Sequence, residues 1–98
     1  MTFRQHGSVR TASGSRYLQQ LCKHWSHKYE VDFEPERGTI ELPLGRVSMT
    51  AGVERLEVAL EPAPEAEPGR LRQVFEDHIN RFAFREGPLD FEWEEVSA

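Results

Sequence analysis

Residues 21–28, LCKHWSHK, bring one thiol, two imidazoles and two amines into a single short segment. Groups of this kind bind metal ions or act in nucleophilic and acid–base catalysis. The apolar residues in and before the segment recur at the i, i+3, i+4 and i+7 positions of a helix, and they are Leu18, Leu21, Cys22 and Trp25. At about 100° per residue, Cys22 then points into the core and His24 lies on the other flank. The two side chains therefore cannot share one ion or act as a nucleophile and its base.

The two histidines of this segment, His24 and His27, are three residues apart and could chelate together. Two ligands are too few for a closed zinc site, so we expect no metal and no cofactor here. We expect Cys22 to be a small buried hydrophobic residue. We expect His27 to be solvated near the end of the helix, where positive charge suits the helix dipole.

A second helix, predicted over about residues 70–84, carries a histidine within its apolar arc. This residue, His78, is expected to be at least partly buried and must then find a partner. Arg81 and Arg85 lie on the same flank of that helix. On the first helix, the flank rotated in the same direction away from its apolar stripe carries Tyr17, His24 and Lys28. If the two helices lie antiparallel on one sheet, these two corresponding flanks either face each other or both face away from the helix pair.

If the flanks face each other, six side chains line one groove, and these candidate ligand-binding residues are Tyr17, His24, Lys28, His78, Arg81 and Arg85. The groove would be cationic in an acidic protein. Arginine forks and tunable histidine donors suit a small carboxylate or phosphate. We then expect the His24 and His78 side chains within about 10 Å of each other, the width of a helix–helix contact, with His78 the more buried.

Two other interpretations of these residues stay open. In the first, Glu86, Asp77 or a carboxylate on a neighbouring strand pairs with the cations and leaves no anion site. In the second, neutral His24 and His78 hold a metal ion together with a third ligand. No residue is assigned a catalytic role, because the sequence has no glycine-rich phosphate loop, no Ser-His-Asp spacing and no paired catalytic carboxylates.

The helices and strands that position the groove are predicted from the spacing of apolar residues along the chain. The first helix is expected over residues 12–29, with Ser13 or Ser15 as its N-cap. The strands are expected over residues 6–12, 29–35, 39–51, 55–61 and 89–95, with a hairpin turn at 43–45 that divides the third of these segments. The proline-rich stretch 61–69 is predicted to be a loop, since proline cannot continue strand pairing.

Alternation along the strands puts apolar side chains on one face of the sheet and polar, mostly acidic ones on the other, among them Glu57 and Glu92. Each helix has a single apolar stripe. This pattern predicts an α+β two-layer sandwich, a mainly antiparallel sheet with two helices packed on one face, in the order β-α-β-β-β-β-α-β. We expect a single α+β domain over residues 5–96.

Composition narrows the class of protein. The chain has 98 residues and a net charge of −5, whereas a general nucleic-acid binder is usually basic. One cysteine permits no internal disulfide and fits a reducing cytoplasm. The chain lacks an apolar run of about 20 residues, the length that spans a membrane, and the apolar stretch of a secretory signal. We expect a cytoplasmic bacterial protein that binds neither nucleic acid nor membrane, with its oligomeric state left open.

Three segments, YLQQLCKHWSHK, ELPLG and DHINRFAFRE, resemble DUF2218, a family of small bacterial proteins of unknown function, and the resemblance covers about residues 9–93. Trp25 stands where the family usually has another aromatic residue. The resemblance implies a fold and a candidate site, with matching positions at Leu21, Cys22, Lys23, His24, His27, Lys28, His78, Arg81, Phe82, Ala83, Arg85 and Glu86. Members of the family occur near siderophore-interacting flavoproteins, which implies a link to iron handling.

Two functions from different classes remain. The first is a non-catalytic binding or accessory module that takes a small anionic ligand or a partner protein, linked to iron or siderophore metabolism. The alternative is a small enzyme, or a metal- or anion-binding protein, that uses His24 and His78 with support from Arg81 and Arg85. A wide pocket ending at the two histidines would favour an enzyme, whereas a filled groove would favour the module.

Overall fold

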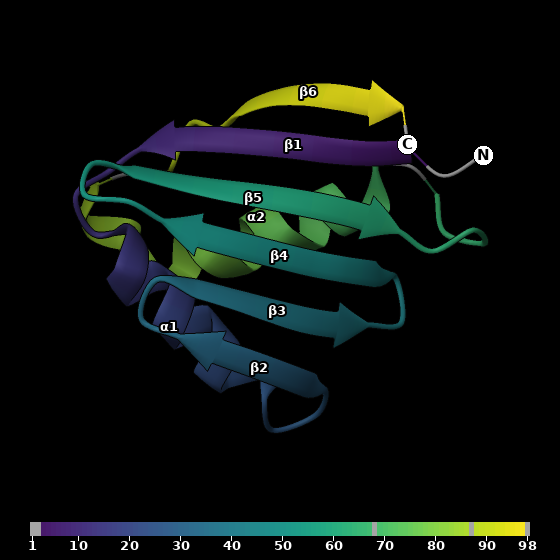
Figure 1. The fold of residues 1–98 in the computed structure, drawn as a ribbon, viewed down its shortest axis with the longest axis horizontal. Coiled ribbons are helices and arrows are strands. Elements are labelled where there is room, and N and C mark those ends of the chain that lie inside the picture. The colour runs from purple at the N-terminus through teal and green to yellow at the C-terminus, as the bar shows by residue number, and fades with distance from the viewer. Residues whose placement is uncertain (1–2, 68, 87, 98) are drawn as a thin grey trace.

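The computed structural model describes residues 3–67, 69–86 and 88–97 (Figure 1). Within these ranges the elements are β1 (Phe3–Arg10), α1 (Gly14–Trp25), β2 (Glu30–Glu34), β3 (Arg37–Leu42), β4 (Gly45–Ala51), β5 (Arg55–Pro62), α2 (Arg70–Phe82), the 3-10 turn η1 (Phe84–Glu86) and β6 (Glu92–Ser97). Their order is the predicted β-α-β-β-β-β-α-β, which is confirmed. The paired strands begin two residues before the expected domain start and end one residue after its expected end.

The described strands form one six-stranded sheet in the order β2-β3-β4-β5-β1-β6. Every neighbouring pair is antiparallel. Strands β2 to β5 form a meander, and β1 lies between β5 and β6 (Figure 1). In the tight β3–β4 turn, Gly45 has φ of 144°, a conformation that favours glycine. The glycine of the ELPLG segment is therefore required by this turn.

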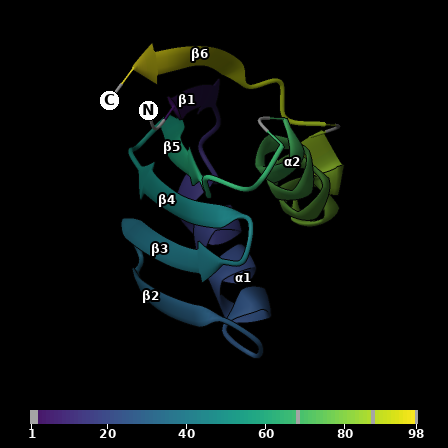
Figure 2. The ribbon, with the colours of Figure 1, turned by 90° about the vertical axis from the view of Figure 1, so that its right-hand side faces the viewer.

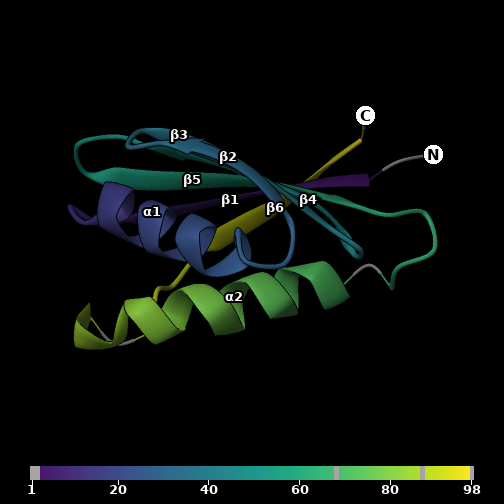
Figure 3. The same ribbon diagram turned by 90° about the horizontal axis from the view of Figure 1, so that it is seen from below.

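Both helices cover the same face of the sheet, as Figure 2 shows edge-on. Figure 3 shows α1 and α2 running side by side in opposite directions beneath the strands. The helices also contact each other directly. The two-layer α+β sandwich is thus confirmed, and the antiparallel helix pair brings one flank of each helix face to face.

The core lies between the helices and the sheet. Each helix contributes the apolar stripe that its periodicity predicts, and the fully buried helical side chains are Leu18, Leu21, Cys22, Leu71, Phe75 and Ile79. Their partners on the strands include Ile40, Val47, Leu56, Val58 and Leu60. The opposite face of the sheet is polar, and the predicted outward residues Glu57 and Glu92 are exposed.

Several predicted boundaries are wrong, among them those of β1, which spans Phe3–Arg10 rather than residues 6–12. Helix α1 ends at Trp25, where its last deeply buried residue lies, rather than at residue 29. The polar residues 26–28 form a turn that brings Tyr29 and Val31 back towards the core. Helix α2 ends at Phe82 and is followed by η1. Strand β6 begins at Glu92, and residues 89–91 before it form a loop in which Leu89 and Phe91 are buried and Asp90 is exposed.

The helix cap also differs from the prediction. Ser13 is the N-cap residue of α1, but its side chain makes no capping hydrogen bond. The Ser15 hydroxyl donates instead to the carbonyl of Pro35 at 2.5 Å. The backbone N–H of Ser13 donates to Oγ1 of Thr11 at 3.1 Å, so a threonine just before the helix orders the entry to α1. In the described part of the chain, neither helix is long and apolar enough to cross a bilayer.

Candidate functional site: the groove between the helices

His24 and His78 face each other across the groove between α1 and α2. Their ring centroids are 5.7 Å apart, with the rings tilted by 42°. His78 is half-buried and His24 is exposed. Both features confirm the expectation drawn from the helix flanks, since only face-to-face flanks bring these residues together.

The imidazole of His78 is held in one orientation. Its Nδ1 lies 2.7 Å from the carbonyl oxygen of Val74, one helical turn earlier. A carbonyl only accepts hydrogen bonds, so Nδ1 carries the hydrogen and donates it. The Trp25 ring packs against the same imidazole at 4.9 Å between centroids. In the neutral ring, Nε2 then keeps its lone pair, which is available as an acceptor, a base or a ligand atom.

Phe82 connects this histidine pair to a hollow at the other end of the groove. Its ring meets that of His24 edge-on, with 6.1 Å between centroids. Beyond Phe82 lies a hollow of about 380 Å³, and its walls are Ser13, Arg16, Tyr17, Gln20, Phe82, Phe84, Arg85 and Glu86. The ring of Phe82 therefore lies between the histidine pair, which it contacts at His24, and the hollow, which it lines.

The carboxylate of Glu86 accepts hydrogen bonds from two hydroxyl groups at the Tyr17 end of the groove. The phenol of Tyr17 donates to Oε2 of Glu86. The hydroxyl of Thr11 donates to the same carboxylate, at 3.0 and 3.1 Å from its two oxygens. Burial, followed by the hydrogen bond to Glu86 and its charge, raises the pKa of Tyr17. These bonds tie η1 to the start of α1 within the lining of the hollow.

The arginines of the groove have no carboxylate partner among the described residues. Arg81 and Arg85 are both exposed, and the ion pairs of the described chain lie elsewhere, as between Arg72 and Glu76. The guanidinium of Arg85 lies over the ring of Phe84, 5.8 Å from its centroid. The interpretation in which Glu86 or Asp77 already pairs with these cations is therefore wrong for the described side chains.

Lys28 lies outside α1, on whose flank it was predicted. Its place on the flank assumed that α1 continues to residue 29, whereas α1 ends at Trp25. The backbone N–H of Lys28 donates to the carbonyl of Trp25 within the following turn. No described contact joins its side chain to His24 or His78. The turn thus removes Lys28 and also His27 from the helical flank.

Of the five other candidate residues, four fall into two pairs. His24 contacts His78, and Tyr17 and Arg85 line the hollow. Arg81 follows His78 by three residues on α2 and so shares its face. The sequence reasoning missed Arg16, Phe84 and Thr11. Phe84 had a signal, since it is an apolar residue beyond the predicted stripe of α2.

Cys22 takes no part in the groove. Its side chain is fully buried in the core, as expected. Burial raises the pKa of its thiol to about 11, which suppresses the reactive thiolate. Among the described residues, no group of three or more His, Cys, Asp or Glu side chains is placed to hold a metal ion. A metal held by His24 and His78 therefore has no third ligand of these types in that part of the chain.

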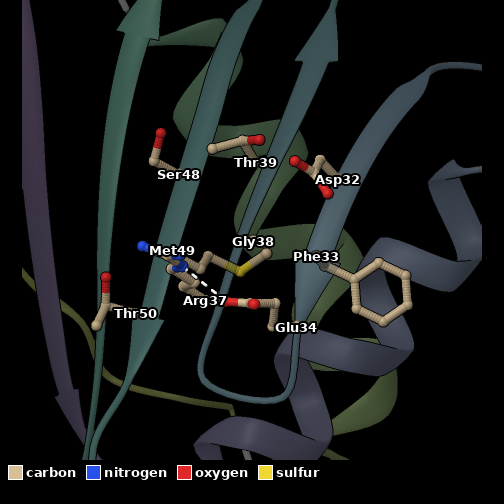
Figure 4. Close-up of a pocket in the computed structure, with 9 residues that line it drawn as sticks. All are labelled: Asp32, Phe33, Glu34, Arg37, Gly38, Thr39, Ser48, Met49 and Thr50. Carbon is tan, nitrogen blue, oxygen red and sulfur yellow. Dashed lines mark hydrogen bonds and ion pairs between the residues drawn. The ribbon is translucent and has the colours of Figure 1, made fainter.

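A second hollow, of about 360 Å³, lies on the open face of the sheet. Figure 4 shows Asp32, Thr39 and Ser48 in a row across three strands, as their pairing register requires. Arg37 and Glu34 beside them form an ion pair at 2.8 Å. The side chains are those of a solvated sheet face, and the two strongest charges neutralise each other. The groove between the helices is the better candidate site.

A family model described as "Uncharacterized protein conserved in bacteria (DUF2218)" matches residues 6–94. Among solved structures, the chain is similar to the NMR structure of PA4090 from Pseudomonas aeruginosa. The two share 35% sequence identity over 94% of this chain and 95% of the other, with a TM-score of 0.76. No curated protein matches the chain. The family resemblance carried by the two helix motifs and the ELPLG turn is thus confirmed.

Proposed function

The chain belongs to the DUF2218 family, and we propose that it is a non-catalytic binding module that holds a small anion in the groove between α1 and α2. One observation carries this proposal. His24 and His78 meet at 5.7 Å beside arginines that have no ion-pair partner among the described residues. A carboxylate or phosphate would supply the missing counter-charge.

The charges of the groove suit an anion of this kind. The protein as a whole carries a net charge of −5, whereas this flank of α2 carries Arg81 and no carboxylate that pairs with it among the described residues. A guanidinium offers several donors in a fixed fork, which matches the two oxygens of a carboxylate or phosphate. Nε2 of His78, whose Nδ1 is held by the carbonyl of Val74, is the ring nitrogen left to interact with a ligand at the edge of the histidine pair.

The hydrogen bonds of the groove support binding more than catalysis. Glu86 and the phenol of Tyr17 satisfy each other, and Nδ1 of His78 is tied to the backbone. These groups fix the shape of the groove. The alternative is a small enzyme in which Nε2 of His78 is a general base with support from Arg81 and Arg85, and the available lone pair on Nε2 is the observation that favours it.

The module is proposed to act in the cytoplasm, where a free thiol such as that of Cys22 stays reduced. The family resemblance adds a link to iron or siderophore metabolism. Carboxylate-bearing iron chelates are anions of the class that the groove suits. Ferric citrate is therefore a useful probe beside phosphate and acetate.

The test is an NMR titration of the ¹⁵N-labelled full chain with phosphate, citrate and ferric citrate. We expect saturable shifts at His24, His78, Arg81 and Arg85. The double substitution His24→Ala and His78→Ala should abolish them with the fold retained. His27→Ala is the matched control, because His27 is an exposed histidine in the turn after α1, and it should bind as the native chain does.

Shifts that survive the double substitution, or that lie on the open face of the sheet, would overturn the proposal. Proton and phosphorus spectra of the ligands in the same samples test the alternative. New signals from a converted ligand would show turnover and favour the enzyme, whereas shifts without conversion support the binding module.

A further inference from the structure

We propose that the hollow at the Tyr17 end of the groove is a subsite for an aromatic ring, and that the natural ligand is an aromatic carboxylate. This inference rests on the proposed function and extends it. It adds Arg16 and Phe84, which that function does not use, as residues that determine specificity.

The first support is an exposed aromatic side chain at the mouth of the hollow. Phe84 is 70% exposed, and large apolar side chains in contact with water mark interaction sites when they gather at a concavity. Phe84 lines the hollow together with the half-buried Phe82 and the buried ring of Tyr17. Val53, which is 88% exposed, lines none of the described hollows. The exposure of Phe84 therefore coincides with a cavity that a ring can enter.

The second support is the charge around these rings. Arg16 approaches the hollow from α1 and Arg85 from η1. Neither has an ion-pair partner in the described part of the chain. The one carboxylate in the lining, Glu86, accepts hydrogen bonds from Tyr17 and Thr11. The lining thus carries two guanidinium groups and one carboxylate, and that carboxylate already accepts hydrogen bonds. The hollow is therefore positively charged on one side and apolar on the other.

The third support is size. A cavity of about 150 Å³ is enough to hold benzene in other proteins, and this hollow has about 380 Å³. A ring with one carboxylate attached fits with space for water. Aromatic rings in contact prefer offset or edge-to-face arrangements, and Phe82 already meets His24 edge-on. A ring placed between Phe82 and Phe84 would continue this row, with its carboxylate towards Arg85.

An aromatic carboxylate satisfies both features of the hollow at once. Phosphate would use the arginines and leave Phe84 in water. An aromatic cation would use the rings and be repelled by the arginines. An aliphatic carboxylate would keep the charge but lose the ring–ring contact and the contact with the guanidinium face.

The experiment titrates the full chain with benzoate, cyclohexanecarboxylate and phosphate and follows the NMR signals of Arg16, Phe84, Arg85, His24 and His78. Benzoate should bind about tenfold more tightly than cyclohexanecarboxylate, the scale of an aromatic contact. Phe84→Leu keeps an apolar side chain and should remove that preference. Arg85→Gln should weaken both carboxylates by a similar factor.

Two matched controls keep the test specific. Val53→Ala changes an exposed apolar residue away from the hollow, and Arg70→Gln changes an exposed arginine at the start of α2, at the opposite end of the helix. Both should bind benzoate as the native chain does. All four substituted residues are exposed, so the fold should be retained.

The outcomes separate the two proposals. Equal affinity for benzoate and cyclohexanecarboxylate, with phosphate still shifting His24 and His78, overturns the aromatic subsite and leaves the anion groove standing. Phosphate that leaves both histidines unmoved overturns the proposed function and this extension with it. Loss of the benzoate preference in Phe84→Leu alone supports the subsite.

Discussion

The sulfur of Cys22 lies directly against the backbone of Gly38. A Cβ atom added at Gly38 would approach Sγ of Cys22 to 2.8 Å and Cβ of Phe33 to 3.0 Å. The glycine of β3 thus gives α1 its close approach to the sheet, and through α1 it sets the position of the groove flank that carries His24.

This contact predicts that Gly38→Ala destabilises the fold by about 1–3 kcal/mol, the cost of overpacking a core. Cys22→Ala should cost about 1 kcal/mol or somewhat more by itself. In the double variant the smaller side chain at position 22 admits the new methyl group, so part of the loss should return. Phe33 still crowds it, and recovery should be incomplete.

Denaturant unfolding of the four proteins in a double-mutant cycle measures this coupling. Gly52→Ala is the control, because the nearest atom to its new Cβ would be 3.6 Å away, an ordinary contact. Strict additivity of Gly38→Ala and Cys22→Ala would contradict the contact.

Burial of the Cys22 thiol predicts slow reaction with a thiol reagent in the native protein and fast reaction in denaturant. The thiol is fully buried, and its pKa of about 11 leaves little thiolate at neutral pH. Labelling rates with and without denaturant at one pH provide the measurement. Native labelling as fast as that of the unfolded chain would show that α1 is rotated from its described position.

The same thiol predicts a loss of stability at alkaline pH. The pKa of Cys22 is raised from 9.0 to about 11 by burial, so the folded state disfavours the thiolate. The resulting stabilisation is complete below pH 9 and is lost as the pH rises towards 11. Tyr17, whose pKa is also raised, adds to the loss above pH 10. The unfolding free energy of Cys22→Ala should fall less over this window, and equal slopes would refute the assignment to Cys22.

The meeting of His24 and His78 could be predicted because it depends on two local quantities. The angle of each residue on its helix follows from 3.6 residues per turn, and the apolar stripes show which side faces the sheet. Only the relative direction of the helices had to be assumed. The polar face of the sheet followed likewise from the period of two along each strand.

The end of α1 and the role of Glu86 could not be predicted in this way. No glycine or proline marks the stop after Trp25, and the helix ends because the chain must return to the sheet as β2. The sequence suggests an ion pair between Glu86 and the arginines. Glu86 turns instead to Thr11, a loop residue 75 positions away, and such a contact leaves no period in the sequence.

The polar face of the sheet predicts tolerance at Glu57 and Glu92. Both side chains are exposed, and Glu57 lies 3.5 Å from Nε2 of His6 in a surface pair of small energetic value. Changing either residue to Gln should move the unfolding free energy by less than about 0.5 kcal/mol. A loss of several kcal/mol would mean that the strand register is displaced by one residue and these side chains point inwards.

The bonds of Glu86 predict that Tyr17→Phe affects both stability and binding. Removing the phenol deletes a hydrogen bond to a carboxylate, which should cost about 1–3 kcal/mol of unfolding free energy. The freed oxygen of Glu86 then lies beside Arg85 in the same hollow. A new ion pair between them would compete with an external anion, so benzoate and phosphate should both bind more weakly. Tyr29→Phe is the control, because no hydrogen bond of the Tyr29 phenol is described, and its effects should be small. Thermal unfolding and the anion titration measure the two effects separately.

A Tyr17→Phe protein that is destabilised yet binds anions as tightly as before would contradict the second effect. It would show that Glu86 stays hydrogen-bonded to Thr11 and forms no ion pair with Arg85 when the Tyr17 phenol is removed.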